Sequence, residues 1–280
     1  MDYLELTLNL SPRDPWAEIL MTELAELGYE SFVETEEGII AYAKVVDVDV
    51  DHPSKGSSID LLEKEFTADL AVKIIPQQNW NALWESDFHP VFVDDQLTIL
   101  APFHDASQAK GLLVWIEPKM SFGTGHHQTT WMMSKALLNL STQPNEVLDM
   151  GTGTGVLAII AEKQGARAIV AVDIEDWSVE NTQENVQRNG CSYIEAICGD
   201  VGVLEGRKFE LILANINKNV LKAHMSAYTQ MLMPSAKLII SGFFETDCDE
   251  LIRVAQNNGL IHTGSLSRET WAALTFEKYI

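Results

Sequence analysis

The sequence predicts an α/β protein in which a large doubly wound sheet follows a smaller α+β domain. Three observations support this fold class. Residues 146–173 run from an apolar strand through a glycine-rich turn into a helical pattern and a second apolar strand. Downstream of this unit, apolar runs alternate with amphipathic segments, which is typical of a mostly parallel sheet. Upstream of residue 76, the expected elements follow the order β-α-β-β-α-β.

The first 75 residues predict a ferredoxin-like domain. Residues 3–10 alternate apolar and polar side chains, as in a half-buried strand, and apolar residues at helical spacing follow up to Gly28. Residues 32–34 and 39–50 are expected to form a hairpin. Ser57 or Ser58 can cap a second helix, and residues 72–75 close the domain with a strand. The apolar side of that second helix would consist of Ile59, Leu62, Phe66 and Leu70.

Residues 76–90 are expected to link this domain, residues 1–75, to a larger domain, residues 91–280. Pro76 marks the boundary, and Trp80, Trp84 and Phe88 recur four residues apart on one side of a predicted helix. Such a stripe is more typical of a core or of a domain-docking surface than of a ligand site.

The chain is strongly acidic, and the excess is concentrated at one end. Its formal net charge is −22, and residues 1–70 hold 17 acids against 4 bases, a net of −13. This balance disfavours direct contact with nucleic acid, whose phosphates would be repelled, and favours a basic partner, although an acidic surface also serves solubility.

The composition predicts a soluble, cytoplasmic protein without a metal site. No apolar run approaches the roughly 20 residues that cross a bilayer, and no leader-like segment opens the chain, so no membrane partner is expected. The three cysteines have no C-x-x-C spacing, and the histidines are scattered apart from one adjacent pair, so neither a disulfide framework nor a metal site is implied. We expect a monomer.

Residues 91–100 and 112–117 predict a small β layer that leads into a loop rich in glycine and hydroxyl groups, residues 120–130. The helix after this loop should begin near Thr129 or Thr130, and the N-terminus of a helix can hold polar ligand groups. The loop could be a plain linker, but so many small residues beside Phe122 are unusual in one.

The glycine turn predicts a nucleoside-bearing cofactor. Gly151, Gly153 and Gly155 follow the strand 147–149, and glycines there let the backbone approach a ligand closely. Asp173 ends the second strand, 22 residues beyond Gly151, where an acid can bind ribose hydroxyls. The alternative is a purely structural turn in another kind of α/β protein.

The details of this turn distinguish between cofactors. A dinucleotide fingerprint has glycine or alanine at the sixth position and an apolar residue two places before its first glycine. Here those positions hold Val156 and Asp149, and an acid would oppose a pyrophosphate. Asp149 suits a ligand with a sulfonium and an amino group, so the pattern resembles the S-adenosylmethionine site of the Rossmann-like methyltransferases.

The rest of the chain completes a sheet of seven strands, one of them antiparallel. Residues 209–216 form an apolar run that closes with the amide Asn215, opposite the expected glycine turn. This amide is well placed for chemistry, although it could simply cap the strand. Asp200 follows another short strand, and it could reach an adenine amino group or lie in a surface turn.

With these residues in view, the chain resembles the PrmA-type methyltransferases of ribosomal protein L11 over nearly its whole length. The resemblance is carried in order by NWNALWESDFHP, SFGTGHHQTT, LDMGTGTGVLAI, AVDI, LANI and the late Trp271. The chain departs from the usual family pattern at Glu117-Pro118-Lys119, where Asp-Pro-Gly is usual, at His126, where Thr is common, and at Gln128, where Pro is common.

The resemblance implies a Rossmann-like methyltransferase domain that binds S-adenosylmethionine. It places the cofactor on Thr130, Gly151, Asp173 and Asn215, with Phe122 at the border of the pocket. It also implies that the small N-terminal domain docks ribosomal protein L11, a basic protein, which gives the acidic excess a partner.

The expected reaction is transfer of methyl groups to lysine ε-amines and the N-terminal α-amine of that protein. Asn215 and backbone carbonyls would accept hydrogen bonds from the amine, while Asp149, Asp173 and the turn with Gly153 hold the cofactor. Two alternatives are an amino-group methyltransferase with another basic protein or a small-molecule substrate, and a non-catalytic module that only binds S-adenosylmethionine. Val156 and Asp149 disfavour a nicotinamide oxidoreductase.

Overall fold

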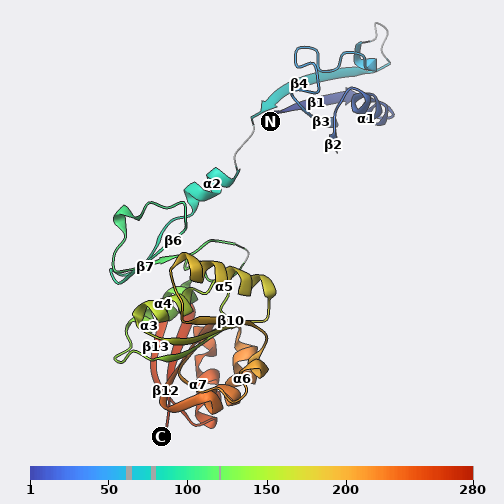
Figure 1. Ribbon diagram of the computed structural model, residues 1–280. Helices are drawn as coiled ribbons and strands as arrows, with labels where there is room; N and C mark the ends of the chain where they lie inside the picture. The colour runs from blue at the N-terminus through green and yellow to red at the C-terminus, as the bar shows by residue number, and fades with distance from the viewer. Residues whose placement is uncertain (61–64, 77–79, 120, 280) are drawn as a thin grey trace. The chain divides into compact units, whose positions relative to one another are not determined.

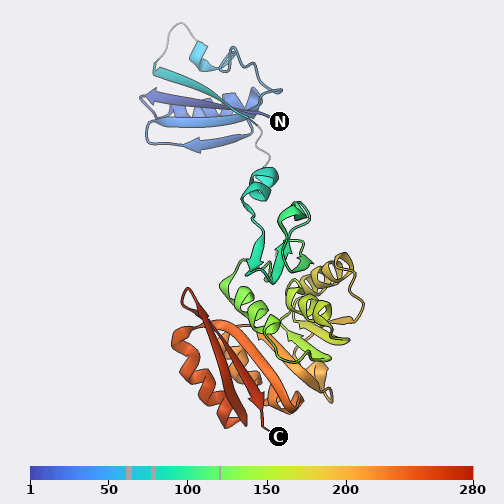
Figure 2. The same ribbon diagram turned by 90° about the vertical axis from the view of Figure 1, so that its left-hand side faces the viewer.

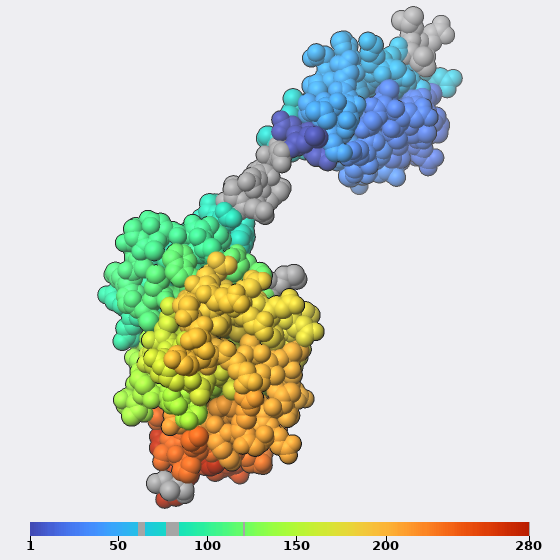
Figure 3. Space-filling model, viewed as in Figure 1, coloured from blue at the N-terminus to red at the C-terminus, as the bar shows by residue number. Residues whose placement is uncertain are grey.

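The computed structural model describes residues 1–60, 65–76, 80–119 and 121–279. The chain divides into two compact units, Met1–Asp87 and Phe88–Ile280, and Figure 3 shows the surface of each in the colours of Figure 1. The division at residue 87 falls inside the predicted linker, and the three-part boundaries at residues 75 and 90 stay a prediction.

The N-terminal unit is a four-stranded antiparallel sheet in the order β2-β3-β1-β4, with α1 packed on one face (Figure 1). β1 alternates as predicted, and its four inward leucines are buried against apolar side chains of α1, including Leu20 and Leu24. The elements are β1 Tyr3–Ser11, α1 Trp16–Glu26, β2 Ser31–Glu34, β3 Gly38–Lys44, the short 3₁₀ helix Ser58–Asp60, β4 Thr67–Ile75 and α2 Trp80–Asp87.

The second helix of this unit was predicted wrongly at its C-terminal part. Leu70 lies within β4, which pairs with β1 along its full length, and Phe66 precedes the strand and stacks on Trp16 with ring centroids 4.4 Å apart. Residues 67–75 are apolar at alternate positions, and pairing with β1 overrides the weaker helical spacing. Leu62 lies outside the described residues.

The long strand predicted over residues 39–50 is also wrong beyond Lys44. β3 pairs with β1, and Lys44 lies opposite Tyr3, the first residue of that strand. Because β1 offers no partner further on, the chain leaves the sheet there, although its side chains remain apolar at alternate positions.

The C-terminal unit holds the predicted seven-stranded sheet, in the order β10-β9-β8-β11-β12-β14-β13. β14 pairs antiparallel with both β12 and β13, and the other described pairs are parallel, so the predicted single antiparallel strand is confirmed. The strands are β8 Glu146–Met150, β9 Ala168–Asp173, β10 Ile194–Cys198, β11 Phe209–Asn215, β12 Leu232–Phe244, β13 Leu260–Arg268 and β14 Trp271–Lys278.

Helices cover both faces of this sheet, as Figure 2 shows. Alternate residues of each strand enter one of two cores, the first with α3 and α4 and the second with α6 and α7. The helices are α3 Gln128–Leu138, α4 Val156–Gln164, α5 Asp176–Arg188, α6 Lys218–Met231 and α7 Cys248–Asn257, with 3₁₀ turns at Ala106–Gln108, Val201–Leu204 and Glu245–Asp247.

The predicted small β layer precedes α3. It consists of β5 Val91–Val93, β6 Leu97–Leu100 and β7 Leu112–Trp115, in that spatial order. Its inward side chains join the core that contains α3 and α4, so the loop that follows β7 starts from a fixed point. In the described part of the chain, no helix is long and apolar enough to span a membrane.

Candidate active site

The glycine turn after β8 can only be made by glycine. Gly151 and Gly153 have φ values of +74° and +58°, in the region that L side chains rarely adopt. A Cβ on Gly151 would lie 2.2 Å from Cγ2 of Ile216, and a Cβ on Gly153 would lie 2.1 Å from the carbonyl oxygen of Phe122. The turn therefore brings its bare backbone against two neighbouring segments.

Asp173 ends β9 beside this turn. Its Oδ2 accepts a hydrogen bond from the backbone N–H of Gly153 at 2.9 Å, and its Oδ1 accepts one from Glu175 at 3.1 Å. The carboxylate lines the cleft at the carboxyl ends of the parallel strands, which is where ligands bind in open α/β sheets.

Asp149 lies beneath the turn. It is 1% exposed, and its Oδ2 accepts hydrogen bonds from the Thr152 hydroxyl at 2.7 Å and from the Ala158 backbone N–H at 3.2 Å. Its side chain therefore ties β8 to the turn and to the start of α4, and it is not among the described residues that line the cleft. Contact between Asp149 and a cofactor amino group stays a prediction.

The pKa of Asp149 provides a test of this arrangement. Burial, opposed by the two hydrogen bonds, raises the pKa from 3.8 to about 6. The folded chain thus holds this proton at pH values where the unfolded chain has lost it, so stability falls as the pH rises from about 4 to about 6.

Asp149→Asn should remove this fall in stability. Relative to the variant, the unmodified chain should lose up to about 3 kcal/mol of unfolding free energy across that window and little above it. Urea unfolding of both proteins between pH 4 and 7.5 measures the difference. A difference that stayed constant with pH would contradict a raised pKa at this carboxyl.

Asn215 is the last residue of β11, and its side chain enters the same cleft. Its Nδ2 lies 3.4 Å from the hydroxyl of Thr130, while its Oδ1 is buried without a hydrogen-bond partner in the described part of the chain. Thr130, in the first turn of α3, is fully buried and meets Asn215 from behind. The result is an acceptor that is fixed in place and unsatisfied, for which an amine is a suitable partner.

The cleft has a volume of about 370 Å³, and polar groups line it at several points. Asp200, the acid that sequence left undecided, is also here, and one of its oxygens accepts a hydrogen bond from Gly202 at 2.8 Å. The described residues that line it are Phe122, Met150, Gly151, Gly153, Asp173, Ile174, Glu175, Ser178, Asp200, Asn215, Ile216, Asn217, Val220 and His224.

The loop before α3 is held on the glycine turn by Thr154. The backbone N–H of Thr154 donates to the Phe122 carbonyl at 2.9 Å, and its hydroxyl donates to the Gly123 carbonyl at 2.7 Å. Phe122, 52% exposed, is thereby held at the mouth of the cleft. Sequence reasoning missed this role of Thr154, since hydroxyls between glycines usually indicate only a turn.

Aromatic rings extend from Phe122 along the same edge of the sheet. His127 packs edge-on against Phe122 and Trp271, with centroid distances of 5.2 and 4.7 Å, and Phe244 lies 4.3 Å from Trp271. Nδ1 of His127 accepts from the Thr129 backbone N–H at 3.3 Å, and burial lowers the pKa of the ring. We call Phe122, His127, Trp271 and Phe244 the aromatic row.

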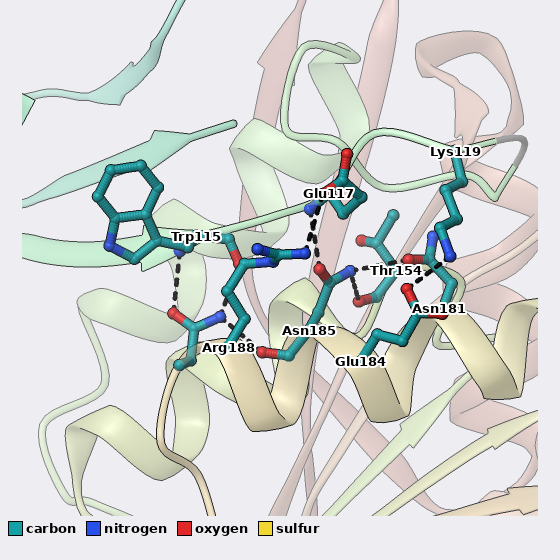
Figure 4. A network of polar contacts seen from close by, with 9 residues as sticks. Trp115, Glu117, Lys119, Thr154, Asn181, Glu184, Asn185 and Arg188 are labelled. Carbon is teal, nitrogen blue, oxygen red and sulfur yellow. Dashed lines mark hydrogen bonds and ion pairs between the residues drawn. The ribbon is translucent and has the colours of Figure 1, made fainter. Parts of the chain in front are cut away.

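A polar network fixes the start of the loop on α5 (Figure 4). Asn185, fully buried, accepts from the backbone N–H of Glu117 at 2.8 Å and donates to the Thr154 carbonyl at 2.9 Å. Glu117 pairs with Arg188 at 2.9 Å, and Lys119 pairs with Glu184 at 2.5 Å. One helix thus holds both the loop and the glycine turn.

The departures from the resembled pattern each have a place in this geometry. Glu117 and Lys119 form the two ion pairs with α5. His126 contacts the backbone carbonyl of His89 at 2.7 Å, and the amide of Gln128 donates to Glu269 at 2.8 Å. These side chains therefore fix the loop by contacts of their own.

Comparison with known proteins identifies the family. The family model described as "Ribosomal protein L11 methyltransferase (PrmA)" matches residues 18–279. The chain belongs to the PrmA family.

Relatives and solved structures agree with this assignment. The chain is 40% identical to the ribosomal protein L11 methyltransferase of Porphyromonas gingivalis, covering 97% of this chain and 92% of that protein. It is 35% identical to the corresponding protein of Phocaeicola vulgatus, with 99% of both chains covered. A ribosomal protein L11 methylase structure from Lactobacillus delbrueckii subsp. bulgaricus matches with a TM-score of 0.64 and 25% identity, covering 69% of this chain and all of that one.

A PrmA-family enzyme is a methyltransferase with S-adenosylmethionine as the methyl donor, and the residues of the cleft fit this cofactor. Gly151 and Gly153 line the cleft without side chains, and the Asp173 carboxylate lies in the same cleft, at the strand ends where ribose hydroxyls bind in such sheets. The structure brings Phe122, Gly151, Gly153, Asp173 and Asn215 to one cleft, whereas Thr130 and Asp149 lie behind it.

Proposed function

We propose that this enzyme methylates amino groups of ribosomal protein L11, both lysine ε-amines and the N-terminal α-amine, and that it acts in the cytoplasm as a monomer. The observation that carries the proposal is the buried, unpartnered Oδ1 of Asn215 beside the glycine turn. The names of the relatives supply the protein substrate.

The chemical requirement is a neutral amine aligned with the methyl group. A lysine amine has an unperturbed pKa of about 10.4, so only its deprotonated minority attacks at neutral pH. Oδ1 of Asn215 can accept a hydrogen bond from that amine, which directs the nitrogen lone pair away from the amide. S-adenosylmethionine supplies a carbon already activated by its sulfonium, so the protein contributes chiefly alignment and the exclusion of water.

The neighbours of Asn215 support this role. Contact with Thr130 fixes the plane of the amide, and the aromatic row can cover the methylene chain of a lysine and attract its cation before deprotonation. His127 is unsuited to act as a general base, because Nδ1 is occupied by the helix cap and the ring has a lowered pKa. The proton therefore leaves to solvent.

Intact-mass analysis of ribosomal protein L11 tests the proposal directly. After incubation with the enzyme and S-adenosylmethionine, we expect mass steps of one methylene, which Asp173→Ala should abolish because the carboxylate that binds ribose is gone. Peptide mapping then distinguishes lysine side chains from the N-terminal amine. Bound cofactor without any mass step would exclude L11 and leave another basic protein or a small amine as the acceptor.

A further inference from the structure

The turn between β13 and β14 consists of two residues that such turns disfavour. Arg268 and Trp271 pair across the hairpin, so Glu269 and Thr270 form the turn, with φ values of +47° and +73°. Turns of this kind favour Asn followed by Gly, and a residue with a branched Cβ is seldom found with positive φ. Strained backbone of this sort is concentrated at functional sites, so the side chains of this turn are candidates for a role beyond stability.

The carboxylate of Glu269 is exposed, oriented and not neutralised. Its Oε2 accepts a hydrogen bond from the side-chain amide of Gln128 at 2.8 Å, and it forms no ion pair within the part of the chain that the structure describes. The adjacent Arg268 is engaged elsewhere, since its guanidinium carbon lies 4.2 Å from the ring centroid of Trp131. A neutral amide fixes the direction of the carboxylate and leaves its negative charge available to a cation.

Glu269 lies at the outer end of the aromatic row. Trp271 follows it two residues later in the chain, and its partner Gln128 follows His127 directly. The ring of His127 lies 4.7 Å from Trp271 and 5.2 Å from Phe122, which lines the cleft. The row therefore leads from the cleft to a negative charge that is held in place.

We propose that Glu269 is a specificity-determining residue, whose carboxylate binds a lysine or arginine side chain within four residues of the target amine in the protein substrate. The inference rests on the proposed function, since it concerns how the same acceptor is chosen. An extended segment places side chains two residues apart about 7 Å from each other, and a helix places those three or four residues apart at about 5–6 Å. Both spacings allow a basic side chain at Glu269 while the target side chain follows the row toward the cleft.

The target amine itself is the less suitable occupant of this position. A carboxylate in contact with an ammonium favours the charged form, and the amine that attacks must be neutral. The cleft offers the neutral acceptor Asn215 instead, and two ring contacts, from Phe122 to His127 and from His127 to Trp271, lie between the cleft and the end of the row. Glu269 therefore suits a second cation of the substrate, which stays charged throughout the reaction.

Steady-state methylation of L11 by the full-length enzyme tests this assignment. At low salt, Glu269→Gln should raise KM for L11 about threefold and Glu269→Lys about tenfold, with kcat and the affinity for S-adenosylmethionine unchanged, because an exposed charge pair acts on binding and not on the chemical step. Both increases should shrink in about 0.5 M salt, where exposed charges are screened.

Glu205→Gln and Glu205→Lys are the matched controls. Glu205 is exposed in the same unit, lines a different pocket beside Lys208, and is not among the described residues of the cleft. These variants make the same charge changes, so the general electrostatic effect on a basic substrate cancels in the comparison. We expect their KM for L11 to stay within about twofold of that of the unmodified enzyme.

Charge exchange tests the identity of the bound group. Once peptide mapping has located the modified amines, L11 is prepared with glutamate in place of the basic residues within four positions of one such amine. Glu269→Lys should then methylate that amine with a KM at least about fivefold lower than that of the unmodified enzyme. A purely structural role of Glu269 cannot produce such a reversal.

The outcomes separate this inference from the proposed function. If L11 is methylated but Glu269→Lys and Glu205→Lys have equal KM values, or if no modified amine has a basic residue within four positions, the inference is overturned alone. No methylation by the unmodified enzyme would overturn both.

Melting temperatures provide the structural comparison. Glu269→Asn removes the charge and introduces a residue that this turn favours, so KM should rise while the melting temperature does not fall. An unchanged KM together with a lower melting temperature for both Glu269→Asn and Glu269→Gln would show that the carboxylate only stabilises the start of α3, and would overturn the inference.

Discussion

Replacing Asn215 with alanine should lower kcat for methylation of L11 by about 10²–10³-fold, the usual effect of removing one preorganised polar group from a reacting centre. The amide oxygen is buried and has no partner among the described residues, and Asn215 lines the cleft, so its loss leaves the attacking amine without an acceptor. Single-turnover rates at saturating L11 and S-adenosylmethionine measure the effect, and calorimetry with S-adenosylmethionine checks that cofactor affinity is retained within about threefold.

Two further observations distinguish the possible roles of Asn215. If it mainly held the cofactor, the variant would lose affinity for S-adenosylmethionine and recover kcat at saturation. Thr130→Val should lower kcat about tenfold, because it removes the hydroxyl that orients the amide, and Thr130→Ser, which keeps the hydroxyl, should restore it. Full turnover by Asn215→Ala with normal cofactor binding would contradict the acceptor role.

Substituting Gly153 with alanine should lower cofactor affinity by at least about 10²-fold. Its new Cβ would lie 2.1 Å from the Phe122 carbonyl oxygen, so either the turn or the loop held by Thr154 must move. That displacement would also disturb the hydrogen bond from Gly153 to Asp173. Calorimetric titration with S-adenosylmethionine measures the loss.

Gly190→Ala is the matched control for this substitution. Gly190 has a φ of +66°, close to the +58° of Gly153, but nothing lies within 4 Å of where its Cβ would be. Both variants bear the same left-handed strain of about 1–2 kcal/mol, so melting temperatures should fall in both. Cofactor affinity should fall only in Gly153→Ala, and a similar loss in both would show that strain, rather than close approach, decides the result.

Local patterns were sufficient to predict most of the C-terminal unit. Its central strands β8, β9 and β11 are buried on both faces and appear as continuous apolar runs, and its glycine turn has a sequence signature because φ restricts the choice of residue. The N-terminal unit was harder. The predictions of its second helix and of its long hairpin strand were wrong. Pairing with β1 decides where β3 ends and where β4 begins, and no local sequence pattern reveals this pairing.

The part of the site that could be predicted from sequence consists of residues at the carboxyl ends of the parallel strands. Asp173 ends β9 and Asn215 ends β11. These two strands lie on either side of β8 in the parallel sheet, so the topology brings the two side chains to the same edge. The burial of Asp149 and Thr130 was not foreseen, because a polar residue in a motif gives no sign of whether it faces the ligand or supports the loop. Asn185 and His127 were missed for a related reason: each holds the loop partly through hydrogen bonds to backbone atoms, and such bonds leave no pattern in sequence.

The position of β4 at the edge of the N-terminal sheet also affects how this enzyme behaves when no partner is bound. An apolar, unpaired strand is a template for pairing between identical copies, and natural proteins avoid such pairing mainly with charge. Here residues 1–87 carry 19 acids against 5 bases, a net charge of −14, which repels a second copy at neutral pH. With a sequence pI of about 4.5, mild acid or high salt removes that repulsion, so these are the storage conditions under which the free enzyme should aggregate.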